Sequence, residues 1–191
     1  MCSQPRVARP GDVCILLEPM AEDLVDLRQR QRKLQRVFGG QVHEPVHLTC
    51  QRFRPEGSRP VRDVIQSLAQ QLAEGRSLPI VAESLEIVEH PFWRSRLLRW
   101  RVQNRLDLTT FCRRLEQVLD RKGIRVHFPS TQGWLPGYVT ALEDVPDGGE
   151  DGIDDRFSFP DHLFDARRVV FSLVEGRERF RILEEIELAA G

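Results

Sequence analysis

The most informative segment of this sequence is Val46-His47-Leu48-Thr49-Cys50-Gln51-Arg52-Phe53. Its apolar and β-branched residues predict a strand, which ends at Arg54-Pro55-Glu56-Gly57. Residues i and i+2 of a strand share a face, so His47 and Thr49 should project together while Arg52 alternates away from His47. An imidazole with a pKa of about 6.5 beside a hydroxyl suits a phosphate, because the histidine can transfer protons and the threonine can donate to a phosphoryl oxygen. The triplet therefore indicates a phosphate site or, alternatively, a structural histidine.

Outward from this strand, the predicted elements repeat an order. Each half has a strand, a helix and a second strand with a polar-x-Thr triplet, first His47-Leu48-Thr49 and then Tyr138-Val139-Thr140. The expected strands are 13–17, 46–53, 79–90, 94–103, 138–142, 169–174 and 180–186, and the expected helices are 24–38, 60–72 and 108–122. We predict an α+β fold with two duplicated strand-helix-strand lobes, whose antiparallel sheets face each other across a central cleft. One domain should span residues 1–191.

Composition narrows the class of protein. The 191 residues carry 28 basic and 29 acidic side chains, with 40% hydrophobic and 30% charged residues, as in ordinary globular proteins. Residues 1–130 carry 22 basic and 15 acidic side chains, whereas residues 131–191 carry 6 and 14. The nearly neutral total thus hides a basic part that could contact phosphate. No apolar run is long enough for a membrane span and no signal peptide is evident, so we expect a cytoplasmic protein without a membrane partner.

Two further features look structural. The cysteines Cys2, Cys14, Cys50 and Cys112 are scattered, which argues against disulfides or a zinc site in a reducing compartment. The segment 143–165 is acidic and contains glycines, but its spacing does not fit an EF-hand. We therefore predict a flexible acidic loop at about 143–165, and no metal or other cofactor.

The chain resembles the 2H phosphoesterase superfamily, which includes RNA 2′-5′ ligase-like and 2′,3′-cyclic phosphodiesterase proteins, over roughly its full length. The segment 46–53 looks like the first H-x-[ST] motif of that family. The segment Pro136-Gly137-Tyr138-Val139-Thr140-Ala141-Leu142 looks like the second, and the tail 169–188 like its closing strands. The resemblance implies metal-independent chemistry, with one histidine as general base, the other as general acid, and the two Ser/Thr residues holding the phosphate.

Carried across, the resemblance gives His47, Thr49, Tyr138 and Thr140 as catalytic candidates, with tyrosine where the family has its second histidine. A phenol with a pKa of about 10 can donate a proton but is a poor base at pH 7. Glu143 stands where relatives often have a basic residue, and would repel a phosphate unless it points away. His127 could swing toward the cleft and replace the missing imidazole, whereas surface or core roles are expected for it otherwise and for the other histidines.

Three residues are candidates for substrate binding. Arg99 and Arg101 alternate with Leu98, Trp100 and Val102, so both should lie on the polar face of their strand, lining the cleft or facing solvent. Trp134, in the loop before the second triplet, could stack on a base. Trp100 should instead pack in the core.

Three functions remain compatible with the sequence. The first is an enzyme that acts on RNA ends or 2′,3′-cyclic phosphodiesters, impaired by the change from histidine to tyrosine. The second is a module that binds a nucleotide or an RNA terminus in the same cleft without turnover. The third is a protein-interaction scaffold that uses the acidic segment, and the sequence identifies no protein partner.

Overall fold

A computed structural model describes residues 8–55, 61–72, 75–90, 95–130, 135–148, 157–176 and 179–190. The elements in these ranges are β1 (Val13–Pro19), α1 (Ala21–Phe38), β2 (Gln41–Val42), β3 (Leu48–Phe53), α2 (Val61–Leu72), β4 (Leu78–Glu89), β5 (Arg96–Val102), α3 (Leu106–Arg121), β6 (Tyr138–Glu143), β7 (Asp161–Gly176) and β8 (Arg179–Glu187). The α+β class and the expected helices and strands are confirmed, with shifted ends. Strand β2 was not expected, because two residues show no periodicity.

The strands form one antiparallel sheet of eight strands, in which the two motif strands are neighbours. Its order is β1-β3-β6-β5-β4-β7-β8, with β2 paired to β6 and β1 paired also to β7. In the order β1-β3-β6-β5, the motif strands β3 and β6 are central. The strands that precede helices α1 and α3, β1 and β5, lie outside them, which is the symmetric order expected of two related halves. Strand β7 joins the halves, because it pairs with β4 through its first residues and with β1 further along.

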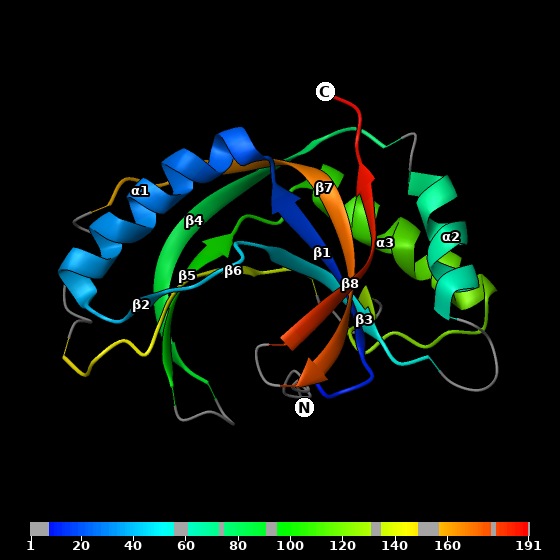
Figure 1. Cartoon of the computed structure of the whole chain (residues 1–191). Coiled ribbons are helices and arrows are strands. Elements are labelled where there is room, and N and C mark those ends of the chain that lie inside the picture. The colour runs from blue at the N-terminus through cyan, green and yellow to red at the C-terminus, as the bar shows by residue number, and fades with distance from the viewer. Residues whose placement is uncertain are drawn as a thin grey trace.

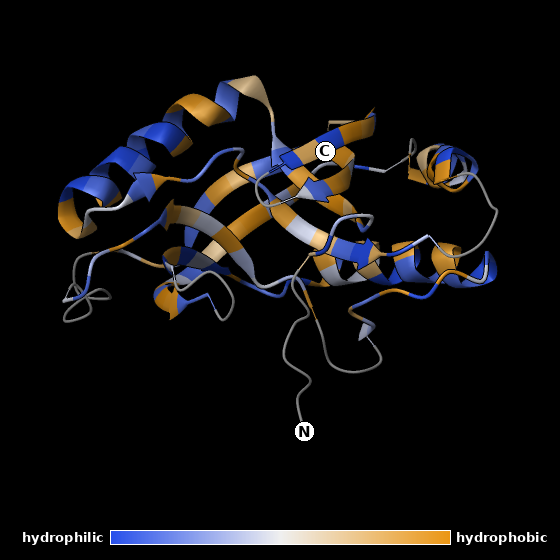
Figure 2. Ribbon diagram, turned by 60° about the horizontal axis from the view of Figure 1, so that its bottom comes forward, coloured by the Kyte–Doolittle hydropathy of each residue, from blue (hydrophilic) through white to orange (hydrophobic). Residues whose placement is uncertain are grey.

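The helices cover the apolar side of this sheet. Figure 1 shows α1 toward one end of the molecule and α2 beside α3 toward the other. In Figure 2 each helix alternates between hydrophilic and hydrophobic bands, and the apolar stripes join one large core with the buried side of the strands. Helix α1 ends at Gly39 and Gly40, whose positive φ angles of 70° and 80° favour glycine. No helix in the described part of the chain is both long and apolar enough to cross a bilayer.

The acidic segment is shorter as a loop than predicted. Glu143 is the last residue of β6, while Asp161 and Asp165 belong to β7 and pair with β4. The sheet therefore takes both ends of the segment, because β-pairing extends past the acidic side chains. Residues 149–156, at its centre, lie outside the described residues.

Candidate active site

The two triplets lie side by side at the centre of the sheet. Leu48 of β3 pairs with Val139 of β6 in antiparallel register, and both side chains are fully buried against the helices. The outer residues of each triplet flank this pair, so they project from the opposite face of the sheet. The side chains brought together on this face are His47, Thr49, Tyr138 and Thr140.

His47 stands just before β3 and is oriented by one hydrogen bond. Its Nδ1 lies 2.8 Å from the carbonyl oxygen of Pro45. A carbonyl only accepts, so Nδ1 carries the proton and Nε2 keeps its lone pair. Burial, and then the positive charge of neighbouring His43, lowers the pKa of His47 to about 4. The half-buried ring is therefore neutral at pH 7 and can accept a proton at Nε2.

The two threonines offer hydroxyl groups on the same face. Thr49 and Thr140 are both half-buried, and neither hydroxyl has a hydrogen-bond partner among the residues that the structure describes. Antiparallel pairing about Leu48 and Val139 sets Thr140 opposite His47. Both hydroxyls can therefore donate to a ligand bound beside the imidazole.

Arg99 brings a cation to this face from β5. It pairs directly with Thr140, and paired residues of neighbouring strands share a face. Its guanidinium lies 5.7 Å from the centroid of the Tyr138 ring, and its buried Nε has no hydrogen-bond partner. Burial lowers the pKa of Arg99, against the opposing effect of Tyr138 and Glu86. Within the described ranges no carboxylate forms a salt bridge with Arg99, so it can bind an anion.

Tyr138 and Arg101 are instead engaged with carboxylates. Tyr138 lies beside Glu86, and burial, followed by the negative charge of that carboxylate, raises the pKa of Tyr138. Arg101 lies 2.8 Å from Glu83 and 3.1 Å from Glu86. Arg99 and Arg101 share the predicted polar face, but only Arg99 keeps its charge unpaired among the described residues. The raised pKa makes the Tyr138 hydroxyl a weak proton donor.

Glu143 also lies on this face, where the sequence alone suggested repulsion of a phosphate. The register between β5 and β6 shifts around Ala141, which turns Glu143 to the same side as Thr140. Its carboxylate contacts Nδ1 of His43, whose ring centroid lies 5.7 Å from that of His47. The sequence predicted a surface or core role for His43. The only signal for a role in the site is that His43 lies three residues before Val46, where the predicted motif strand begins.

Arg52 lies on the same face as Thr49, contrary to the prediction that it alternates away. Leu16 of β1 pairs with Thr49 and Cys14 pairs with Arg52, because Cys50 is an extra residue in β3. Arg52 is only 6% exposed and its guanidinium stacks 4.7 Å above the Phe128 ring. This packing gives Arg52 a structural role.

His127 does not replace the missing imidazole. Its Nε2 lies 3.8 Å from a carboxylate oxygen of buried Asp12, and its backbone N–H donates to the carbonyl of Arg52. These contacts hold His127 near the far end of β3, several residues along the strand from His47. The suggestion that it swings into the site is therefore wrong.

The structure describes Trp100 but not Trp134. Trp100 is 3% exposed and packs in the main core, as expected. Trp134, the predicted stacking residue, lies outside the described residues. Those residues also contain no group of three or more His, Cys, Asp or Glu side chains that could hold a metal ion.

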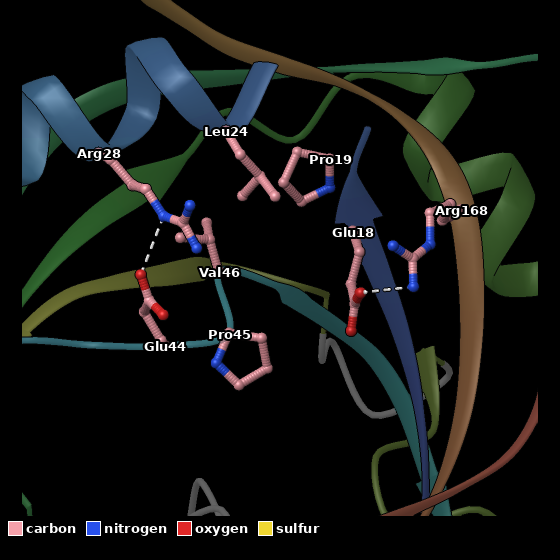
Figure 3. Close-up of a pocket in the computed structure, with 8 residues that line it drawn as sticks. All are labelled: Glu18, Pro19, Leu24, Arg28, Glu44, Pro45, Val46 and Arg168. Carbon is pink, nitrogen blue, oxygen red and sulfur yellow. Dashed lines mark hydrogen bonds and ion pairs between the residues drawn. The ribbon is translucent and has the colours of Figure 1, made fainter. Parts of the chain in front are cut away.

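A pocket of about 310 Å³ adjoins the site at the start of α1. Its lining residues are Glu18, Pro19, Leu24, Arg28, Glu44, Pro45, Val46 and Arg168. Two ion pairs cross it, Arg28 with Glu44 at 3.0 Å and Arg168 with Glu18 at 3.4 Å (Figure 3). Since Pro45 accepts the hydrogen bond of His47, the pocket reaches the segment that orients the imidazole.

Comparison with solved structures shows which fold this is. LigT of E. coli in apo form aligns over 95% of this chain and 99% of its own, with a TM-score of 0.56 and 12% identity. A crystal structure described as a phosphoesterase gives 0.58 and 15% over the same shares. TT0787 of Thermus thermophilus gives 0.58 and 13% over 94% and 98%.

The chain has the fold of LigT. The two triplets of the sequence are thus carried by a LigT-like fold. No protein-family model and no curated protein matches the sequence. Identities of this size show the LigT fold alone, so the function has to be argued from the side chains of the site.

Proposed function

We propose that this protein is a 2H phosphoesterase-like protein that binds terminal or 2′,3′-cyclic phosphates of RNA or nucleotides, and hydrolyses the cyclic form slowly without a metal. The observation that carries the proposal is the oriented Nε2 of His47 on one face with two available threonine hydroxyls. LigT, which shares the fold, has been crystallised with 3′-AMP and with phosphate, and these ligands contain the group expected here.

In this proposal His47 is the general base. A water molecule attacks the phosphorus and gives its proton to Nε2 of His47, which is free because Nδ1 donates to Pro45. Thr49 and Thr140 donate to the non-bridging oxygens, and Arg99 balances their charge. The remaining requirement is an acid for the leaving oxygen, and the raised pKa of Tyr138 makes the phenol a poor one.

The test is hydrolysis of a nucleoside 2′,3′-cyclic phosphate by purified protein in the presence of EDTA. We expect slow formation of a single monoester, with the same rate after addition of Mg²⁺ or Mn²⁺. Absence of both turnover and binding of 3′-AMP would overturn the proposal.

The raised pKa of Tyr138 favours a second candidate, a module that binds the same phosphates without turnover. Replacing Tyr138 with phenylalanine removes a hydroxyl that lies beside the carboxylate of Glu86, so affinity for 3′-AMP should change less than about threefold. Calorimetric titration of both proteins measures this. Binding by a wild type that never opens the cyclic phosphate would support the module over the enzyme.

Arg99→Met is expected to weaken the affinity for 3′-AMP or inorganic phosphate by roughly 10- to 100-fold. A hydrogen bond to a charged group contributes about 1.5–3 kcal/mol, and Arg99 has no competing salt bridge with a described residue. Arg101→Met is the matched comparison, because Glu83 and Glu86 already neutralise its charge. We expect a smaller loss in that variant, and equal losses would contradict the role of Arg99.

A further inference from the structure

His43 is held firmly at the edge of the site by groups from two elements. Its backbone N–H donates to the carbonyl of Ala141 at 3.1 Å, and its own carbonyl accepts from Nε2 of Gln31 at 2.9 Å. Gln31 belongs to α1, is fully buried and also donates to the carbonyl of Ala141 at 3.1 Å. The amide of Gln31 thus ties His43 to the bulge that turns Glu143 toward the site.

The side chain of His43 is also oriented. Glu143 contacts its Nδ1, and the two side chains are 20% and 24% exposed. The contact fixes the ring, so Nε2 is its remaining nitrogen for proton transfer, and a carboxylate that orients an imidazole is a recurring arrangement at catalytic sites. The carboxylate of Glu143, three residues after Thr140, therefore has a partner in His43. It is not an unpaired negative charge that would repel a phosphate.

The separation of the two imidazoles suits one shared phosphate. Their ring centroids lie 5.7 Å apart, with 52° between the planes. Rings this close to each other can flank the oxygens of a single phosphate group. His47 is set up as a base by Pro45, whereas His43 carries a carboxylate partner. Unequal surroundings of this kind separate the acid from the base in a catalytic pair.

We propose that the Glu143–His43 pair supplies the second imidazole of this site, in place of the histidine that Tyr138 replaces. This inference rests on the proposed function. As the water oxygen bonds to phosphorus, His47 takes its proton; the bond from phosphorus to the leaving ribose oxygen breaks, and that oxygen takes the proton from Nε2 of protonated His43. The proton on His47 then returns to His43 through solvent, which restores both rings.

Few other charges surround the two rings in the described part of the chain. The charged groups are Glu143 on β6, Glu44 and its partner Arg28 on α1, Glu18 on β1 and its partner Arg168 on β7, and Arg99 on β5. Two of these three carboxylates thus have an arginine partner and the third contacts His43 itself. The ionisation of His47, whose pKa is lowered to about 4, should therefore govern the acid side of the pH dependence of the site.

The test is the pH profile of kcat/KM for cyclic phosphate hydrolysis in wild type, His43→Gln and Glu143→Gln. If His43 is the acid, the decline of the wild-type rate at high pH depends on the His43 side chain and not on the phenol of Tyr138. His43→Gln should lower kcat by about 10²-fold or more and remove this high-pH decline. A decline that first sets in above pH 10, or that persists in His43→Gln, would overturn the proposal.

Three further measurements test the role of His43 and distinguish it from a folding defect of the His43→Gln variant. His162→Gln is a matched control, because His162 contacts a carboxylate too, that of Asp165 at 3.0 Å, but is exposed at the start of β7. Tyr138→His should raise kcat less than about tenfold if His43 already provides the acid, and a hundredfold gain would overturn the proposal. Histidine NMR titrations need no turnover: removing His43 should raise the pKa of His47 from about 4, and an unchanged pKa would contradict the ring contact. Wild-type turnover with an unaffected His43→Gln refutes this inference alone.

Discussion

Replacing His47 with alanine is expected to lower metal-free hydrolysis of a 2′,3′-cyclic phosphate by about 10²–10⁴-fold, the usual contribution of a general base. The reason is the lone pair of Nε2. The hydrogen bond from Nδ1 to the carbonyl of Pro45 leaves this lone pair available to accept a proton. Steady-state kinetics of the purified variant measure the loss. Activity that survives the substitution would contradict the role of His47.

The pH dependence gives this prediction a second measurement. The pKa of His47 is lowered to about 4, so the ring is neutral above that value and protonated below it. A protonated ring cannot accept a proton, so the wild-type kcat/KM should fall as the pH drops through about 4. Any residual activity of His47→Ala should lack this decline, and affinity for 3′-AMP should change far less than the rate does.

Replacing Asp12 with alanine is expected to destabilise the folded protein by about 3–5 kcal/mol, the cost of removing one partner from a buried ion pair. Asp12 is fully buried, and its carboxylate accepts from Arg54 at 2.8 Å and from the backbone N–H of Arg9 at 2.8 Å. Arg52, itself 6% exposed, lies 4.0 Å away and would lose its nearest carboxylate. Urea unfolding of both proteins measures the change.

Asp12→Asn separates charge from shape in this cluster. The amide oxygen can still accept from the backbone N–H of Arg9, while the negative charge facing Arg52 and Arg54 is gone. We expect an intermediate loss of stability. If alanine costs less than about 1 kcal/mol, the buried ion pairs contribute little and the account of this cluster is wrong.

Much of the fold follows from periodicity in the sequence. The alternation of Leu98, Trp100 and Val102 with arginines predicts which face of β5 is buried, and the structure agrees. The same alternation predicts that the first and third residues of each triplet share one face of the sheet. Long apolar stripes at helical spacing locate the helices, because each must bury one side.

Periodicity fails where a strand carries an extra residue. Cys50 in β3 and Ala141 in β6 each shift the register by one position, so Arg52 and Glu143 appear on faces that strict alternation does not give them. No residue type marks either bulge. The contact between His43 and Glu143 also joins segments 100 residues apart, and only tertiary structure brings them together.

The central pairing of β3 with β6 has a consequence for how a ligand is oriented. Two identical triplets in antiparallel register would form a cradle with near twofold symmetry, in which a phosphodiester could bind equally well in either direction. Here one end carries two imidazoles and the other a phenol beside Glu86. The two ester oxygens of a bound phosphate therefore meet different surroundings. Because the symmetry is broken, a nucleic-acid strand that contains this phosphate should cross the sheet in one preferred direction.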